Sequence, residues 1–528
     1  MQNRNVKDSG LIDDKQRVTC DRAEEIGSAI QNGLDGKTFI ECSFKRKEQI
    51  TSMQTLYSSI KIDQEEITID PLTLFLRLAV AVERKPENEI SSYFAYELSP
   101  YPMSLFKDGI MRAAQKSKLK SFILEKVVTR DHPLCRTIVD GGALLWCCNW
   151  KRNEIFHEIF VKYSNLLKHL KADTVVFDGY SVSTKDVTHQ KRSGMISQMI
   201  EIHDQLPCLA ERSVFLTNYT NKNNFVVFLA EKLRLDGFEV VLCPSDADTT
   251  IVKVAVESNS PVNVYSDDTD VLCLLLHHSR GLKSDIYVTN MSRAKNSERK
   301  CYRIKDIVQT LDGNILSNLL FAHAFTGCDT TSAIYKFGKL SIFTKLKSKR
   351  LNDIAAMFYN ETLSTDEIGN ATILFFQSLH STSLSLPEVR KQKYEDMITS
   401  NRAQIDPAVL PPSPRAAYFH GLRVFHQIKV WRHLSDIDLD PLDWGWKMKD
   451  GMFIPIMTDI AAGPDDILKL IRCSCKGSCD RRCSCRKAGL HCTLSCKECH
   501  GTACSNTEIV DSELSEEDDR HFLDAFSI

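Results

Sequence analysis

The sequence has no long run of apolar residues. No stretch approaches the roughly 20 apolar residues that a transmembrane helix needs, and the opening MQNRNVKDSG lacks the apolar core of a secretory signal. There is also no internal repeat and no long low-complexity tract. These absences argue against a membrane or repeat protein, and we expect a soluble, intracellular chain with no membrane partner.

An excess of charge of one sign is missing too. The chain has 67 Lys and Arg residues against 69 Asp and Glu residues, so its formal charge at pH 7 is -2. Such a balance gives no overall sign of a nucleic-acid partner, and any evidence for one must come from local patches. The apolar fraction of 43% suffices to bury a core, and 528 residues allow two or three domains.

Short apolar runs alternate with helical patterns from residue 137 to about residue 334. Five runs rich in β-branched residues end at Gly, Ser or Asp, which predicts buried strands. They are TIVDGG, TVVFDGY, EVVLCPSDAD, PVNVYSDDTD and DIYVTN. Between the second and the third, NFVVFLAEKLRLDG has helical spacing with Gly237 as its C-terminal cap. This alternation predicts an α/β fold in which helices flank a parallel sheet.

Seven aspartates lie at or just beyond the ends of these segments. They are Asp140, Asp178, Asp246, Asp248, Asp268, Asp270 and Asp329. Carboxylates gathered at one sheet edge would repel one another unless cations neutralise them, and oxygen ligands favour Mg²⁺ or Mn²⁺. Two such ions about 4 Å apart can support phosphodiester hydrolysis. For any single aspartate, a helix N-cap or a turn is the simpler explanation.

The order of these motifs resembles a known family. VFDGYSVSTKDVTHQKR, PSDADTTI, YSDDTDVL and TGCDTTSA resemble the carboxylate motifs of flap endonucleases, related structure-specific nucleases and PIN-like asteroid proteins, and IVDGGALLW resembles their first strand. The resemblance covers residues 137–335 and implies that Asp140 is the leading metal aspartate. It implies that one side of a two-ion site consists of Asp178, Asp246 and Asp248. It implies that the other side consists of Asp268, Asp270 and Asp329.

Two basic residues stand where the family places its phosphate contacts. Lys185 and Arg192 lie seven and fourteen residues beyond the VFDG aspartate, and the resemblance implies that they neutralise charge in the transition state. By chemistry alone, they would be solvated helix charges. The histidines at 189 and 323 are less favoured acid–base candidates, because metal-activated water needs none. Aspartates replace the usual glutamates in DAD, and IYKFGKLSIFTKLKSKR replaces the glycine-rich motif that grips duplex DNA.

Nine of the 19 cysteines fall within one short segment near the C-terminal end. In a reducing compartment, such clustering favours zinc over disulfides, and folding of the segment would depend on the metal. The spacing resembles the CXC modules of tesmin-like and male-specific-lethal chromatin proteins, which implies a cluster of three zinc ions with bridging sulfurs. The implied ligands are Cys473, Cys475, Cys479, Cys483, Cys485, Cys492, Cys496, Cys499 and Cys504. We expect His491 and His500 to be bystanders.

Basic residues outnumber acidic ones on this segment, which predicts phosphate contact and DNA as a partner. The candidate DNA contacts are Arg481, Arg482, Arg486 and Lys487. Further charge comes from Arg472, Lys476 and Lys497. The alternative is a solvated face on a module that binds proteins. The acidic segment DSELSEEDDRHFLD, which follows, is expected to be disordered.

The flanking regions carry fewer clues. Asp70 followed by Pro71 predicts a helix start. Trp444 and Trp446 are expected to be packing anchors, with base stacking as the alternative.

The predicted organisation has five parts. They are a helical accessory region (1–130), a PIN-like domain (131–380), a partly ordered connector (381–470), a CXC zinc module (471–505) and an acidic tail (506–528). Together these parts predict a nuclear, Mg²⁺- or Mn²⁺-dependent DNA nuclease, a combination that resembles transposon-associated proteins. Two alternatives stay open, namely a DNA- or chromatin-binding scaffold without hydrolysis and a ribonuclease. The sequence leaves the oligomeric state undetermined.

Overall fold

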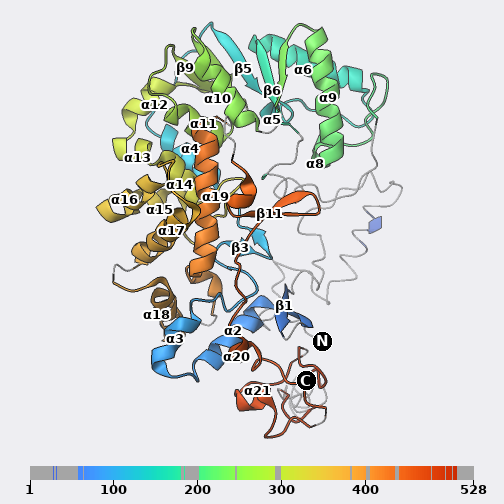
Figure 1. Ribbon diagram of the computed structural model, residues 1–528. Coiled ribbons are helices and arrows are strands. Elements are labelled where there is room, and N and C mark those ends of the chain that lie inside the picture. Colours follow the sequence, from blue (N-terminus) through green and yellow to red (C-terminus); the bar gives the residue numbers. More distant parts are fainter. Residues whose placement is uncertain are drawn as a thin grey trace, which may run out of the picture. The chain divides into compact units, whose positions relative to one another are not determined.

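The computed structural model places most of the chain in two compact units (Figure 1). It describes residues 28, 31–32, 58–62, 65–179, 184, 201–243, 246–291, 299–380, 383–399, 405–434, 439–476, 478–493, 495–501 and 504–507. Unit 1 comprises Met1–Thr51, Met103–Val389 and Ala408–Asp459, and unit 2 comprises Ser52–Pro102, Arg390–Pro407 and Ile460–Ile528. Within the described residues, no helix combines the length and apolarity that crossing a bilayer requires.

Unit 1 is built around a six-stranded sheet in the order β10-β9-β8-β5-β6-β7. The strands are β5 (Arg136–Asp140), β6 (Thr174–Phe177), β7 (Glu239–Leu242), β8 (Val262–Tyr265), β9 (Ile286–Thr289) and β10 (Cys301–Arg303). Strands β5 to β9 pair in parallel, which confirms the five predicted strands, and β10 adds an antiparallel edge. The chain winds outward from β5 in both directions, so the sheet has its switch point between β5 and β8.

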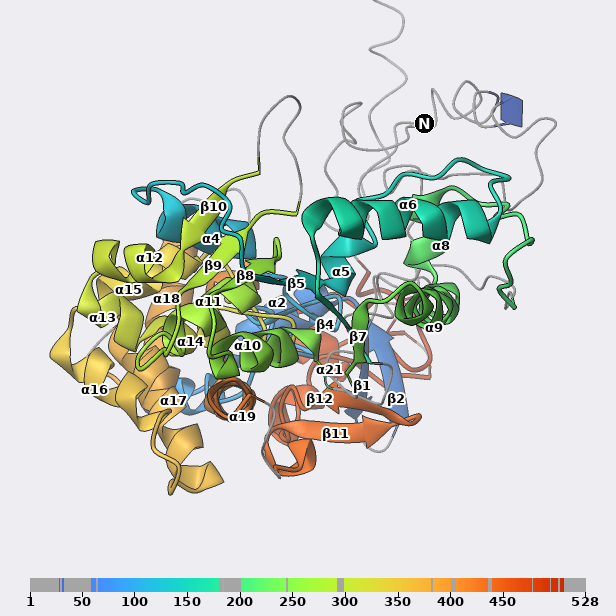
Figure 2. The same ribbon diagram turned by 90° about the horizontal axis from the view of Figure 1, so that it is seen from above.

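Helices cover both faces of this sheet (Figure 2). On one face, residues of β5, β6 and β7 share a hydrophobic cluster with α6 (Phe156–Leu170), α8 (Arg212–Thr217) and α9 (Tyr219–Leu235). On the other face lie α10 (Ala247–Glu257) and α11 (Thr269–His277). Gly237 has φ +92°, which lets the amide of Phe238 donate to the carbonyl of Leu233 and ends α9 as predicted.

A group of helices next to the sheet completes the core of unit 1. It includes α4 (Lys116–Leu124), α12 (Ile304–Thr310), α13 (Gly313–Ser317), α14 (Leu319–Phe325), α15 (Lys339–Lys345), α16 (Lys349–Met357), α17 (Thr365–His380) and α19 (Pro414–Arg432). The chain also forms α18 (Leu386–Thr399) and a hairpin of β3 (Phe106–Lys107) and β4 (Ile110–Met111).

Helix α19 corrects the expectation of a partly ordered connector over residues 381–470. Nearly all of its residues are buried, and it lies against α17 at close range. A Cβ on Gly421 would come within 1.7 Å of Thr372 Oγ1, so only glycine permits this approach. Because α19 is covered on all sides, its sequence shows no apolar stripe, and the periodicity that reveals a surface helix is absent.

The two tryptophans of the same segment pack as expected. Trp444 stacks on Phe425 with ring centroids 4.6 Å apart, and only 1% of Trp446 is exposed. Trp446 begins a hairpin of β11 (Trp446–Lys449) and β12 (Met452–Pro455). Their role is therefore structural.

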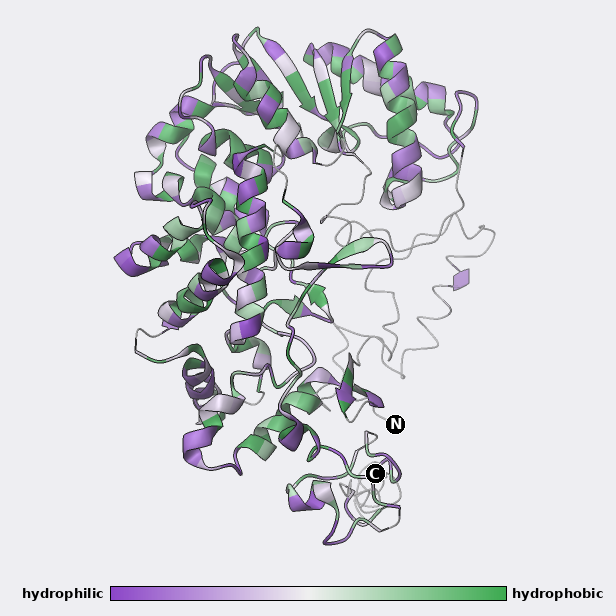
Figure 3. Cartoon of the chain, viewed as in Figure 1, coloured by the Kyte–Doolittle hydropathy of each residue, from purple (hydrophilic) through white to green (hydrophobic). Residues whose placement is uncertain are grey.

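Unit 2 is smaller and mixes strands with helices. It contains β1 (Ser58–Ile62), β2 (Glu65–Ile69), α2 (Pro71–Val82), α3 (Glu87–Tyr93), α20 (Asp465–Leu468) and α21 (Ser484–Lys487). The antiparallel β1–β2 hairpin departs from the expectation that residues 1–130 are helical. Asp70 accepts the amide of Thr73 at 2.8 Å, which confirms the predicted start of α2. Helix α2 is mostly hydrophobic (Figure 3) and buries most of its side chains.

Candidate functional site

Three of the candidate metal ligands stand where a loop enters a helix. Asp140 precedes α5 (Gly141–Leu144), Asp246 precedes α10, and Asp268 precedes α11. A carboxylate oxygen of each accepts a first-turn backbone amide at 2.7–3.1 Å. The simpler explanation, a helix N-cap, is therefore correct for all three. It does not exclude metal binding, because each carboxylate has a second oxygen and further lone pairs.

Asp140 and Asp178 approach the same point at the carboxyl end of β5. A Cβ on Gly142 would lie 3.2 Å from Asp140 Oδ1 and 3.7 Å from Asp178 Oδ2. Ser266 donates to Asp140 at 2.7 Å, and the amide of Ala247 donates to Asp178 at 3.1 Å. Burial raises the pKa of Asp140, and the Asp178 carboxylate adds to that increase. A cation at this point would relieve the repulsion.

Asp270 and Asp329 both contact a lysine that the sequence analysis did not single out. Lys116 is the first residue of α4, and its Nζ lies 2.9 Å from Asp270 Oδ2 and 2.8 Å from Asp329 Oδ2. Burial lowers the pKa of Lys116, but the charges of Asp270, Asp329 and Asp268 outweigh it and raise this pKa. Burial, with the charge of Asp270, raises the pKa of Asp268 to about 7.

Asp270 is also held from behind. Its Oδ1 lies 2.7 Å from His323 Nε2, and His323 Nδ1 lies 2.8 Å from the Nζ of Lys339. Because Lys339 donates to Nδ1, the Nε2–H of His323 donates to Asp270. Burial lowers the pKa of His323 to about 4, and its ring stacks on Trp431 at 5.3 Å. His323 thus positions Asp270, and its burial leaves it no route to act on a substrate.

A second lysine of α4 contacts the loop between β8 and α11. Lys120, one turn after Lys116, donates to the carbonyl of Asp267 at 2.9 Å. Burial lowers the pKa of Lys120. The KSKLK pattern of α4 is the local signal that sequence reasoning passed over, since two lysines four residues apart share one helix face.

The structure therefore brings the aspartates to one edge of the sheet without closing them into a tight cluster. Asp248 lies in the first turn of α10 and is buried. Across the described ranges, each set of three or more metal-type ligand atoms within 4.8 Å of one another consists of cysteines. Lys185, Arg192 and His189 lie outside the described residues.

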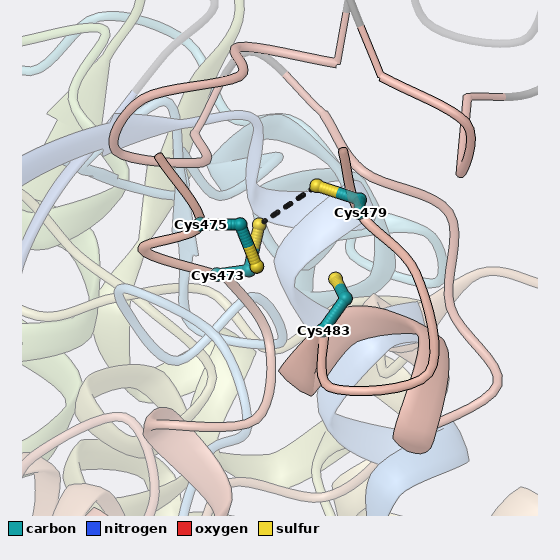
Figure 4. Close-up of side chains that lie close together, drawn as sticks. All are labelled: Cys473, Cys475, Cys479 and Cys483. Atoms are coloured by element: carbon teal, nitrogen blue, oxygen red, sulfur yellow. Dashed lines mark hydrogen bonds between the residues drawn. The ribbon is translucent and has the colours of Figure 1, made fainter. Parts of the chain in front are cut away.

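The cysteines of unit 2 form such sets. Three overlapping groups of four sulfurs occur, and Cys473 belongs to all of them. The groups are Cys473, Cys475, Cys479 and Cys483 (Figure 4); Cys473, Cys479, Cys492 and Cys499; and Cys473, Cys485, Cys492 and Cys496. Cys504 packs against the same cluster. His491 and His500 are exposed and belong to none of the three groups.

The sulfur spacing suits tetrahedral zinc. Neighbouring sulfurs lie 3.6–3.8 Å apart, and a tetrahedron with Zn–S bonds of about 2.3 Å has edges of about 3.8 Å. A hydrogen bond from Cys485 lowers the pKa of Cys496 to about 4. The two sulfurs lie 3.6 Å apart, a separation at which one zinc ion can bind both as thiolates.

The rest of unit 2 contacts this cluster through charged side chains. Arg77 of α2 is buried and donates to the carbonyls of Ile471 and His491 and to Cys485 Sγ at 3.4 Å. Glu65 of β2 pairs with Arg472 at 2.7 Å and with Lys497 at 2.6 Å. Two residues of the expected basic patch are therefore neutralised within the unit.

The four candidate DNA contacts remain exposed. Arg481, Arg482, Arg486 and Lys487 all present exposed side chains, and the last two belong to α21. The backbone of Lys487 accepts a hydrogen bond from Arg84 at 2.8 Å. Lys476 is exposed as well, so the exposed positive charge of the module extends over residues 476–487.

Comparison with known proteins gives one family match and several structural similarities. Residues 5–97 match a family described as a domain of unknown function (DUF8702). No curated protein matches. The catalytic core of Rad2 in complex with DNA is 14% identical and has a TM-score of 0.31; the similarity covers 64% of this chain and 85% of that one.

Two further solved structures show similarity of the same order. The eukaryotic junction-resolving enzyme GEN-1 is 14% identical over 63% of this chain and 80% of its own, with a TM-score of 0.29. Flap endonuclease-1 from Methanococcus jannaschii is 14% identical over 58% of this chain and 98% of its own, with a TM-score of 0.29. At TM-scores this low, the fold assignment rests on the sheet order and helix placement of the chain itself.

Proposed function

We propose that unit 1 is a metal-dependent nuclease domain that hydrolyses DNA phosphodiester bonds, and that the cysteine module of unit 2 binds zinc and helps to hold DNA. The observation that carries this proposal is the convergence of Asp140 and Asp178 over Gly142, at the carboxyl ends of the parallel strands β5 and β6. The motif resemblance of residues 137–335 supports the same reaction. A nuclear location agrees with it and stays a prediction.

The residues present fit a hard divalent ion at this point. Asp140 and Asp178 offer carboxylate oxygens, and burial has already raised the pKa of Asp140, so a cation there would stabilise its charged form. Such an ion, when bound, supplies an activated water and withdraws charge from the phosphate. Ser266 and the amide of Ala247 hold the two carboxylates in place. We propose that Lys185 and Arg192 bind the phosphate.

The cysteine module fits zinc on the sulfur geometry described above. We propose that the nine cysteines of residues 473–504 would together hold three zinc ions, with some sulfurs shared between ions. The exposed charges of Arg481 and Arg482 on this module would contact phosphates, because charge of this kind binds the DNA backbone without reading sequence.

The test is cleavage of labelled flap, single-stranded and duplex DNA, and of matched RNA, by the full chain in Mg²⁺ or Mn²⁺. We expect cleavage that Asp178→Asn and EDTA both abolish. Asp267→Asn is the matched control, because Asp267 lies beside the candidate ligands without being one of them, and this variant should cleave normally. Cleavage of RNA alone would instead indicate a ribonuclease.

One observation favours a second function, a DNA-binding scaffold without hydrolysis. Lys116 already bridges Asp270 and Asp329, which the resemblance places on one side of a two-ion site. DNA binding without cleavage of any substrate, in both metals, would identify the protein as such a scaffold.

A further inference from the structure

Two aspartates of the predicted two-ion site contact a cation that belongs to the protein. The Nζ of Lys116 lies between Asp270 and Asp329, at 2.9 Å and 2.8 Å from their Oδ2 atoms. These are the distances of charge-assisted hydrogen bonds. A Mg²⁺ ion would need oxygens at about 2.1 Å in near-octahedral geometry, and it would use the same lone pairs. The ammonium and the ion cannot both occupy this position.

Asp270 has little freedom to turn toward an ion instead. Its other oxygen accepts a hydrogen bond from His323, and only 2% of its side chain is exposed. His323 is itself fixed, because Lys339 donates to its Nδ1 and Trp431 stacks on its ring. Both oxygens of Asp270 are thus committed to groups of the protein, and the network holds the carboxylate that receives Lys116.

Helix α4 is placed to deliver this lysine. Lys116 and Lys120 are four residues apart on α4, and they contact Asp270 in the first turn of α11 and Asp267 in the loop before α11, respectively. Two anchors from one helix face fix the helix relative to the loop. The side chain of Lys116 is only 19% exposed, so its position is determined by its surroundings and not by solvent.

From this geometry, we propose that Lys116 is the resident cation of the Asp268, Asp270 and Asp329 side and excludes a divalent ion from it. This inference rests on the proposed function. The nuclease would then use one divalent ion, at Asp140 and Asp178, together with a lysine. An ammonium has three N–H donors, and two of them go to Asp270 and Asp329. The third can donate to a phosphate oxygen and stabilise its charge without transferring a proton.

The proposal is tested by counting Mn²⁺ ions bound to the zinc-loaded full chain, using electron paramagnetic resonance of free Mn²⁺ and calorimetric titration. Lys116→Met should bind one more Mn²⁺ per chain than the wild type. Adding Asp329→Asn to that variant should remove the extra ion. Lys120→Met is the matched control, because its lysine contacts Asp267, and it should gain none.

A second measurement does not depend on how Lys116→Met folds. In the wild-type background, Asp329→Asn should leave the Mn²⁺ count unchanged. A count that falls by one, or a Lys116→Met variant that gains no ion, would overturn the proposal. The ion count needs no substrate, so it gives its answer even for a protein that cleaves nothing, and cleavage assays judge the nuclease function separately.

Discussion

The carboxylate edge of unit 1 and the cysteine cluster of unit 2 neutralise their ligands in opposite ways. At the carboxylate edge, the protein supplies the compensating groups, which are backbone amides, Ser266 and the ammonium of Lys116. In the cysteine cluster, sulfurs face other sulfurs at 3.6–3.8 Å, and Arg77 donates to one of them. The first arrangement can exist without metal, whereas we expect the second to depend on zinc for its cohesion.

The two regions also differ in what lies beneath them. Val139, Val175 and Val264 place a buried aliphatic sheet under the aspartates. In the cysteine module, the buried cluster consists of the cysteines themselves, with Leu490 packed against it. A hydrophobic core stabilises unit 1 independently of its carboxylates. In the cysteine module, the buried core consists of the candidate zinc ligands themselves.

Zinc removal should therefore produce the largest difference in stability between the two regions. With a high-affinity zinc chelator, amide hydrogen exchange over residues 473–504 should rise to the rate of an unstructured chain, because structural zinc contributes about 10–16 kcal/mol. Exchange in β5, β6 and β8 should not change. Restoring zinc should restore protection. Equal loss of protection in both regions would contradict the comparison.

Arg77→Met should produce the next largest effect. It leaves the carbonyls of Ile471 and His491 without their buried donor, and loss of such charged hydrogen bonds costs about 3 kcal/mol. We expect faster zinc release to a chromogenic chelator. Arg84→Met is the control, since the exposed Arg84 makes one backbone hydrogen bond to Lys487. Equal release rates in the two variants would show that Arg77 does not support the cluster.

Acid should weaken both units, and only unit 2 should be rescued by excess zinc. Burial lowers the pKa of His420 in α19 from 6.5 to about 3. Below pH 6.5 the unfolded chain binds this proton while the folded chain does not, so stability falls as the pH falls from 6.5 toward 3. For one group, the loss is about 1.4 kcal/mol per pH unit.

Urea unfolding of unit 1 at pH 6.5 and pH 5, in excess zinc, measures this effect. The loss of stability between the two values should be about 2 kcal/mol smaller in His420→Gln than in the wild type. An equal loss in the two proteins would mean that His420 is not kept neutral by its surroundings.

The same contrast explains which features the sequence could reveal. The five parallel strands are visible because each β-branched run ends at Gly, Ser or Asp, and Asp70 with Pro71 marks the start of α2. These are local signals. Lys116 meets Asp270 across 154 positions, and Arg77 meets Ile471 across 394. No local pattern can report such pairs.

Burial on all sides hid a whole element in the same way. Hydrophobic periodicity in a helix arises from the boundary between its solvent-exposed face and its buried face. Helix α19 lacks such a boundary, and a close approach through Gly421 adds to its burial. The pairing of Glu65 with Arg472 and Lys497 likewise reduces a basic patch that looks continuous in the sequence.

Asp140→Asn should have the smallest effect on stability. It tests whether the Asp140 carboxylate binds a metal ion or only caps the helix that follows it. Asparagine keeps the oxygen that accepts the amide of Ala143. It also removes one of two neighbouring buried charges, which burial and Asp178 oppose. In EDTA, we therefore expect the free energy of unfolding to rise by about 1 kcal/mol. In Mn²⁺, the wild type should gain stability by mass action and the variant should not, so their order should reverse. Asp267→Asn, which lies outside the ligand set, should gain as the wild type does. If Asp140→Asn instead lowers the free energy of unfolding in EDTA and Mn²⁺ still stabilises the variant, Asp140 acts only as the N-cap of its helix. The contrast between a carboxylate edge that tolerates the loss of its metal and a cysteine cluster that unfolds without it would then rest on Asp178.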